Sequence, residues 1–187
     1  RDAAPANVQL VSRDETQRKL DGRTAVAMNY MANNPDTIAD RFEESAQRLV
    51  DRPFLLEGDI TYTYGQLNGR ANQVARALQA QGVRKGDVVA MSLENRAAFF
   101  FVWLAINKLG AIAAFMNTYI QGKPLVHSLN VTNAKFVVVG EECASLYAAT
   151  QELPALTYMH WPDAERPADP AVLAQFGPSL EQLSANL

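Results

Sequence analysis

Residues 88–115, VVAMSLENRAAFFFVWLAINKLGAIAAF, contain the pattern that decides the fold. Residues 88–93 form a short apolar run typical of a strand, and residues 111–115 form a second one. Between them, residues 95–109 are long enough for a helix, which Gly110 can end because glycine adopts left-handed backbone angles without a Cβ clash. A strand, a helix and a strand in this order predict a parallel βαβ unit with a right-handed crossover.

The same alternation continues toward the C-terminus. A short helix is predicted to open at Lys123 and Pro124, because proline is tolerated in the first helical turn. Residues 136–139 and 156–160 read as further strands, with a helix over residues 141–151 between them. The sequence therefore predicts an α/β fold with a largely parallel sheet that is buried on both faces.

The two ends of the chain are less regular. The first 20 residues are polar and weakly patterned, and we expect them to form an arm. Four prolines, at positions 162, 167, 170 and 178, break any regular element, so residues 161–178 are predicted to be an extended loop. A short helix is expected near residues 180–183.

The segment before the βαβ unit predicts two helices and a hairpin. Residues 37–50 carry apolar side chains on one helical face, and the short runs 54–56 and 60–62 predict a hairpin because Gly58 and Asp59 lie between them. Thr63 and Gln66 have the spacing of a capping box. The helix that they open shows an apolar stripe and stops before Gly82; the stripe consists of Leu67, Ala71, Val74, Ala75 and Leu78.

Composition excludes several classes of function. The chain has 187 residues, a net charge of −3 and no cluster of basic residues denser than Arg84-Lys85, so we expect no binding to nucleic acid. The single Cys143 cannot form an intramolecular disulfide, which favours an intracellular, cytoplasmic location. The longest apolar run, residues 97–106, is far too short to cross a bilayer. Peripheral contact with a membrane surface stays open.

The common catalytic and nucleotide-binding motifs do not occur in the sequence. No two glycines are two residues apart, which excludes the dinucleotide fingerprint, and Gly122-Lys123 lacks the preceding glycine of a P-loop. No serine lies in a G-x-S-x-G elbow. The two histidines, His127 and His160, have no partner at metal-ligand spacing and read as packed or surface residues. We therefore assign no catalytic, cofactor-binding or metal-binding residue.

Three weaker candidates have a simple structural interpretation. Glu141 and Glu142 beside Cys143 could hold a metal, but acidic residues at a helix start are favoured by the helix dipole. Tyr62 and Tyr64 could stack on a ligand, although packing explains them more simply. The third candidate is residues 117–119, Asn-Thr-Tyr, which follow a predicted parallel strand at its carboxyl end, where α/β sheets place ligand sites. They are the best candidates for a pocket wall, and an ordinary polar turn is the alternative.

Several segments resemble one enzyme superfamily. Residues 60–68, ITYTYGQLN, and residues 108–117, KLGAIAAFMN, resemble the first two core motifs of the AMP-forming, adenylate-forming ligases, the acyl-CoA synthetase superfamily. Residues 82–90, GVRKGDVVA, are also similar in order and spacing, and the resemblance covers about residues 37–143. Residues 113–118, 122–125 and 128–131 resemble most the fatty-acid-transport branch, the long- and very-long-chain acyl-CoA synthetases.

The chain departs from the superfamily pattern in ways that affect function. Asn117 stands where many members carry proline, and Gln66 stands where many carry glutamate. Because either glutamine or glutamate completes a capping box, the structure should tolerate the second change. The superfamily's phosphate loop, its nucleotide-contacting motifs and its mobile C-terminal domain are absent, and we expect them beyond Leu187. The chain then corresponds to the opening half of the large N-terminal domain.

The resemblance implies a fatty-acid:CoA ligase as the parent protein. Such an enzyme uses ATP, Mg²⁺ and CoA: a fatty carboxylate attacks ATP to give an acyl-adenylate and pyrophosphate, and CoA then displaces AMP. This chain alone is expected to be inactive, to bind none of these cofactors and to be open to self-association. The alternative is a non-catalytic α/β module that binds a protein partner or a membrane surface through its aromatic segment around residues 99–103.

Overall fold

The computed structural model describes residues 12–33 and 36–186, and the chain divides into two units. The first, Arg1–Asp36, contains in its described part the helix α1 (Arg13–Asn33). Residues 13–20, which were expected to belong to an arm, are therefore helical. Acidic residues in the first turn and an ion pair between Glu15 and Lys19 at i,i+4 spacing stabilise that turn. The rest of the expected arm, residues 1–11, lies outside the described residues.

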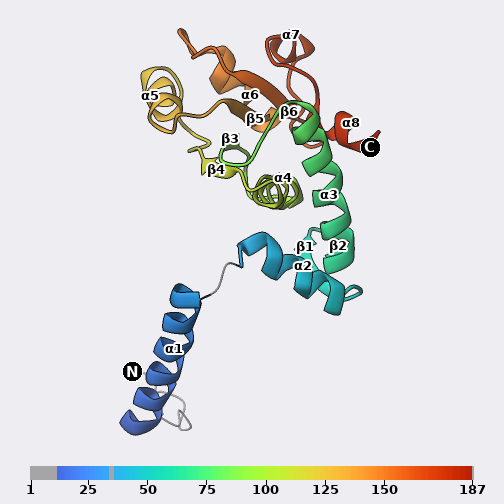
Figure 1. The fold of residues 1–187 in the computed structure, drawn as a ribbon. Helices are drawn as coiled ribbons and strands as arrows, with labels where there is room; N and C mark the ends of the chain where they lie inside the picture. The colour runs from blue at the N-terminus through green and yellow to red at the C-terminus, as the bar shows by residue number, and fades with distance from the viewer. Residues whose placement is uncertain (1–11, 34–35, 187) are drawn as a thin grey trace, which may run out of the picture. The chain divides into compact units, whose positions relative to one another are not determined.

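The second unit, Thr37–Leu187, is built around a four-stranded parallel sheet (Figure 1). Its strand order is β4 (Ile112–Phe115), β3 (Val88–Ser92), β5 (Phe136–Gly140) and β6 (Thr157–Trp161). All three neighbouring pairs are parallel. The α/β fold with a parallel sheet predicted from the sequence is thus confirmed.

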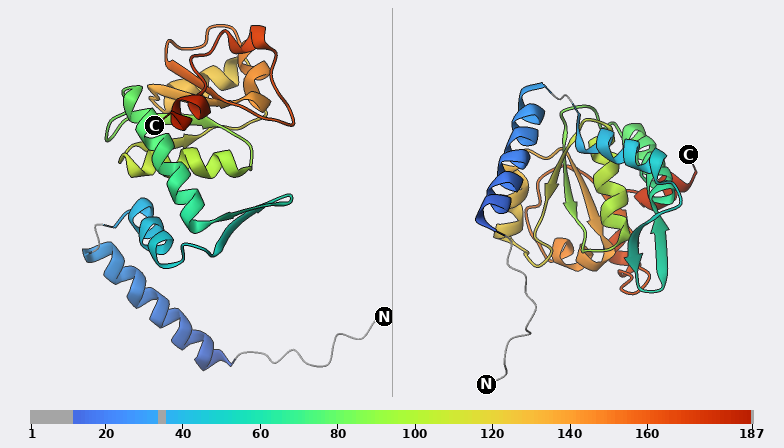
Figure 2. Two further views of the ribbon diagram at one scale, coloured as in Figure 1. Left: turned by 90° about the vertical axis from the view of Figure 1, so that its right-hand side faces the viewer. Right: turned by 90° about the horizontal axis from the view of Figure 1, so that it is seen from below.

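Alternation along the strands divides the core into two layers. Val89 and Met91 belong to one buried cluster, whereas Ala90 between them belongs to the other. The first layer contains α3 (Tyr64–Ala80) and α4 (Ala97–Lys108), and the second contains α5 (Lys123–Val131) and α6 (Glu141–Ala148), on opposite faces of the sheet (Figures 1 and 2). The central strands β3 and β5 are covered on both faces, as the apolar runs predict, whereas Ile112 and Phe115 of the edge strand β4 are exposed.

The predicted helix ends at Gly82 and Gly110 are confirmed. Their φ angles of 99° and 65° lie in the left-handed region, which other residues rarely adopt. Helix α4 is buried over most of its surface, although Phe99, Phe100 and Trp103 are only half-buried. No helix in the described ranges is both long and apolar enough to cross a membrane.

A helix and a hairpin precede the sheet. Helix α2 (Ile38–Arg48) buries Ala39, Phe42 and Ala46, and strands β1 (Pro53–Glu57) and β2 (Ile60–Thr63) form the predicted antiparallel hairpin. After β6 in the sequence come the short helices α7 (Pro170–Leu173) and α8 (Leu180–Ala185).

Helix α7 corrects the prediction of an unbroken loop over residues 161–178. Pro170 opens it rather than breaking it, because proline suits the first helical position and Asp169 accepts a hydrogen bond from Ala171 N at 2.7 Å.

The capping box at the start of α3 gives the first stability prediction. Thr63 Oγ1 accepts from Gln66 N at 3.2 Å, and Gln66 Oε1 accepts from Thr63 N at 2.9 Å. We expect Thr63→Ala to lower the free energy of unfolding by about 0.5–2 kcal/mol. Gln66→Glu should leave it within about 0.5 kcal/mol, because glutamate completes the same box. Urea denaturation of the three proteins checks this, and equal losses for both variants would contradict it.

Alkaline pH should destabilise the second layer of the core. Burial raises the pKa of the Cys143 thiol and of the Tyr158 hydroxyl to about 12 each, and it also raises the pKa of Tyr147. The unfolded chain releases these protons earlier, from about pH 8.5 for the thiol and about pH 10 for the phenols. Because the unfolded state then binds fewer protons, stability should fall as the pH rises from about 8.5 toward 12.

Urea midpoints measured at pH steps between 8 and 11 test this expectation, with Cys143→Ala as the matched variant. The variant should lose less stability than the parent chain between pH 8.5 and 10, where only the thiol contributes. A midpoint that does not change over this range would refute it.

Candidate functional site

The carboxyl ends of β3 and β4 border a cleft of about 540 Å³. The turn after β3 contributes one wall and the turn after β4 the other. The lining consists of Leu93, Glu94, Asn95, Phe99, Phe115, Met116, Asn117, Thr118 and Tyr119. Because ligands of open parallel sheets bind outside the carboxyl ends of the strands, this is the candidate functional site of the chain.

Residues 117–119 lie in the cleft wall, where the sequence suggested a pocket wall, and they also form an ordinary polar turn. Asn117 Oδ1 accepts a hydrogen bond from Tyr119 N at 2.9 Å, which fixes the turn. The Tyr119 side chain is 81% exposed and Phe115 is 57% exposed. The two readings are compatible, because the turn holds aromatic side chains at the mouth of the cleft.

A buried threonine holds the far end of this loop. Thr150 Oγ1 accepts from Gly122 N and donates to Leu146 O, both at 2.7 Å. Thr150 itself is buried, and both hydrogen bonds are partly buried. The loop after β4 is thereby attached to α6 as well as to its own strand.

The lining of the cleft does not fit a nucleoside triphosphate such as ATP. Binding a triphosphate needs cations and converging N–H donors. The cleft residues include one carboxylate, Glu94, which pairs with Arg166 at 2.9 Å, and no Lys or Arg is among them. In the ranges that the structure describes, no group of three His, Cys, Asp or Glu side chains could hold a metal ion.

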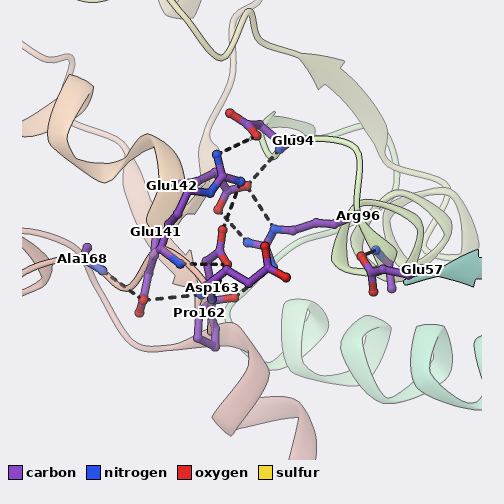
Figure 3. Close-up of polar contacts among 11 residues, drawn as sticks. Glu57, Glu94, Arg96, Glu141, Glu142, Pro162, Asp163 and Ala168 are labelled. Atoms are coloured by element: carbon purple, nitrogen blue, oxygen red, sulfur yellow. Dashed lines mark hydrogen bonds and ion pairs between the residues drawn. The ribbon is translucent and has the colours of Figure 1, made fainter. Parts of the chain in front are cut away.

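A buried ion pair joins the loops beside the cleft (Figure 3). Glu142, at the start of α6, has a side chain with 0% exposure. Its carboxylate accepts from Arg96 Nη2 at 2.7 Å, from Arg96 Nε at 3.1 Å and from Glu94 N at 2.9 Å. Arg96 Nη1 also donates to Pro162 O at 2.9 Å. We call Arg96 and Glu142 the latch, because they join the loops after β3 and β6 to the first turn of α6.

Glu141 fixes the neighbouring loop, residues 162–168. Its Oε2 accepts from Ala168 N at 3.2 Å and from Asp163 N at 3.4 Å. Asp163 Oδ1 in turn accepts from Glu165 N at 3.0 Å and from Arg166 N at 3.3 Å. Both glutamates lie in the first turn of α6, as the helix-dipole interpretation requires, but their main partners are other loops.

The remaining candidates do not meet at one site. His127 is exposed on α5, and His160 on β6 donates from Nδ1 to Gly177 O at 3.0 Å. The packing interpretation of the tyrosines is confirmed: the ring centroid of Tyr64 lies 4.9 Å from Phe54, and that of Tyr62 lies 5.5 Å from Phe101.

Comparison with known proteins finds one family and several relatives for this chain. A family described as "AMP-binding enzyme" matches residues 42–183. The chain is 41% identical over 122 residues to Long-chain fatty acid transport protein 2 of Rattus norvegicus, which covers 64% of this chain and 19% of the relative. It is 38% identical over 116 residues to the Medium/long-chain-fatty-acid–CoA ligase FadD6 of Mycobacterium tuberculosis, 62% of this chain and 19% of the relative.

Solved structures share the fold. The anthranilate CoA ligase AuaEII in complex with anthranoyl-AMP superposes with a TM-score of 0.66 at 24% identity, over 79% of this chain and 27% of that protein. The N-terminal domain of FACL13 from Mycobacterium tuberculosis gives a TM-score of 0.61 at 28% identity, over 69% of this chain and 33% of that one. The chain spans about a fifth of the length of the curated relatives it matches.

Proposed function

Because this chain belongs to the AMP-binding enzyme family of acyl-CoA ligases and related adenylate-forming enzymes, we propose that it is part of a long-chain fatty-acid:CoA ligase. The observation that carries the proposal is its identity of 41% and 38% to relatives named for long-chain fatty acid transport and for medium- and long-chain fatty-acid ligation. Its similarity to aryl-acid ligases supports the fold alone.

The proposed reaction has two steps. The carboxylate of a fatty acid attacks the α-phosphate of ATP, so that the bond to pyrophosphate breaks and an acyl-adenylate forms. The thiol of CoA then attacks the acyl carbon and AMP leaves. Mg²⁺ would neutralise charge on the phosphates in the first step.

The lining of the cleft does not fit Mg²⁺–ATP, and we assign no step of this reaction to the described residues. What they supply is support for the edge of the cleft: the latch and Thr150 hold the loops beside it through partly buried hydrogen bonds. We therefore expect this chain alone to be inactive and the activity to belong to a longer protein.

Acyl-CoA formation by the natural gene product tests the proposal. Purified protein is incubated with ATP, Mg²⁺ and CoA and with acids from hexanoate to tetracosanoate, with anthranilate as the aryl control. We expect thioester products from long-chain acids and little from anthranilate. Product from anthranilate but from no fatty acid would overturn the fatty-acid assignment and leave the family unaffected.

A second candidate is a non-catalytic module of intracellular, cytoplasmic location that touches a membrane surface. It is favoured by the aromatic side chains at the cleft mouth, Phe115 and Tyr119, which are exposed. If it holds, the 187-residue chain should sediment with liposomes of phosphatidylcholine and phosphatidylserine, and Phe115→Ser together with Tyr119→Ser should remove most of this binding. A folded chain that stays in the supernatant would exclude it.

We also propose that the isolated chain associates with a second copy of itself. Strand β4 is an edge of the parallel sheet, and its Ile112 and Phe115 side chains are exposed. Exposed apolar edge strands favour pairing between molecules. Sedimentation should therefore show mass that rises with concentration, and Ile112→Lys should reduce it because a charge blocks such pairing. A sharply monomeric parent chain at high concentration would contradict this.

A further inference from the structure

An open groove of about 750 Å³ runs along α3, away from the cleft described above, with which it shares no lining residue. Figure 1 shows α3 extending from the β1–β2 hairpin at one end to α8 at the other. The side chains that matter for the argument are Tyr62, Gln66, Arg70, Gln73, Arg76 and Glu181.

The amide oxygens of the two glutamines in the groove already accept hydrogen bonds. Thr63 N donates to Gln66 Oε1 at 2.9 Å, and Arg70 Nη1 donates to Gln73 Oε1 at 3.2 Å. A backbone N–H and a guanidinium can only donate, so each glutamine must turn its oxygen to that partner. Within the described residues, neither Nε2 group has a hydrogen-bond partner of its own. Both Nε2 groups can therefore still donate a hydrogen bond to an acceptor.

The charged groups of the groove also favour an acceptor. Arg70 lies 5.5 Å from the centre of the Trp161 ring and reaches Glu181 at 3.5 Å, which is a loose ion pair. In the described ranges Arg76 has no ion pair or hydrogen bond. Two guanidinium groups thus face one carboxylate, and the groove has an excess of positive charge in a protein whose net charge is −3.

We propose that this groove binds an organic anion whose carboxylate or phosphate lies between Arg70, Arg76 and the Gln73 amide, which is three residues from each arginine on α3. Charge-assisted hydrogen bonds from guanidinium groups are the strongest that such a head group can form. The ring of Tyr62, packed edge-on against Phe101 at 5.5 Å, lines the groove and gives an apolar surface for the body of the ligand. This site is independent of the proposed ligase reaction.

Titrations of the ¹⁵N-labelled 187-residue chain with three probes test the proposal. Phenyl phosphate and phenylacetate carry the two anionic heads on the same ring, and phenylacetamide is the neutral counterpart of phenylacetate. We expect saturable amide shifts in residues 61–76 and 181 with at least one anion, and about tenfold weaker binding of phenylacetamide. The stronger of the two anions identifies the head group. Equal affinity for all three probes, or no saturable shift with either anion, would overturn the proposal.

Two variants separate the site from general charge effects. Glu181→Gln removes the carboxylate that competes for Arg70 and should tighten anion binding by about threefold, whereas Arg76→Gln should weaken it by about threefold. Arg48→Gln, at the exposed end of α2, is the matched control and should change nothing. Because Glu181 and Arg76 are outside the core, both variants should fold, as their spectra will report. Weaker binding by Glu181→Gln, or equal weakening by Arg48→Gln and Arg76→Gln, would also refute the site.

Discussion

Replacing Glu142 by alanine is expected to lower the free energy of unfolding by about 3–5 kcal/mol. The change leaves the Arg96 guanidinium, whose side chain is only 17% exposed, without its counter-ion. It also removes the acceptor of the Glu94 backbone N–H. A largely buried charge without its counter-ion, together with a partly buried donor without its acceptor, is among the few defects that reach this size. Urea denaturation at pH 7 measures the loss.

The control is an ion pair of similar length on the surface. Arg41 and Glu44 lie 2.8 Å apart with both side chains exposed, so Glu44→Ala should change stability by about 0.2–1 kcal/mol. The double replacement Arg96→Met with Glu142→Leu should recover the part of the loss that comes from the unpaired Arg96 charge, whereas the Glu94 N–H and the Pro162 carbonyl stay without their partners. If Glu142→Ala were no worse than Glu44→Ala, the latch would not be a structural element.

Leu78→Ala should produce a loss of similar size, about 2–5 kcal/mol. Leu78 is fully buried on α3, in the core layer that α3 and α4 form against one face of the sheet. Removing its methyl groups leaves a cavity in the core, because the surrounding structure relaxes only in part. The midpoint of urea unfolding should fall without a change in slope, because the native fold remains the same.

The matched variant for this prediction is Leu56→Ala on β1. Leu56 is 72% exposed, so the same chemical change removes little buried surface and should alter stability by less than about 0.5 kcal/mol. A difference of less than about 1 kcal/mol between the stability losses of the two variants would show that the α3 interface is not part of the core.

The elements with local signals could be predicted from the sequence. Apolar runs gave the four strands, the Thr63 and Gln66 pair gave the start of α3, and Gly82 and Gly110 gave two helix ends. Each of these signals depends on residues within a few positions of one another, so a short segment of the sequence is enough to predict the element. The position of residues 117–119 beside the cleft followed from a general rule for parallel sheets.

The features that depend on distant residues could not be predicted. Arg96 and Glu142 are 46 positions apart, and nothing in either segment indicates its partner. The groove along α3 combines α3 with Glu181 on α8, so its charge balance exists only in the folded chain. The helices α1 and α7 were missed for another reason: Asp14, Glu15 and Asp169 are good signals for a helix start, but the polar or proline-rich surroundings outweighed them.

The central claim is that this chain is part of an AMP-forming fatty-acid:CoA ligase and is inactive alone. Fatty-acid-dependent exchange of labelled pyrophosphate into ATP tests it most directly, because only the reversible adenylation step gives this exchange. It should be measured in parallel on the 187-residue chain and on the natural gene product. We predict exchange with the natural product and none with the chain alone. No exchange with either protein, for acids from hexanoate to tetracosanoate, would contradict the claim.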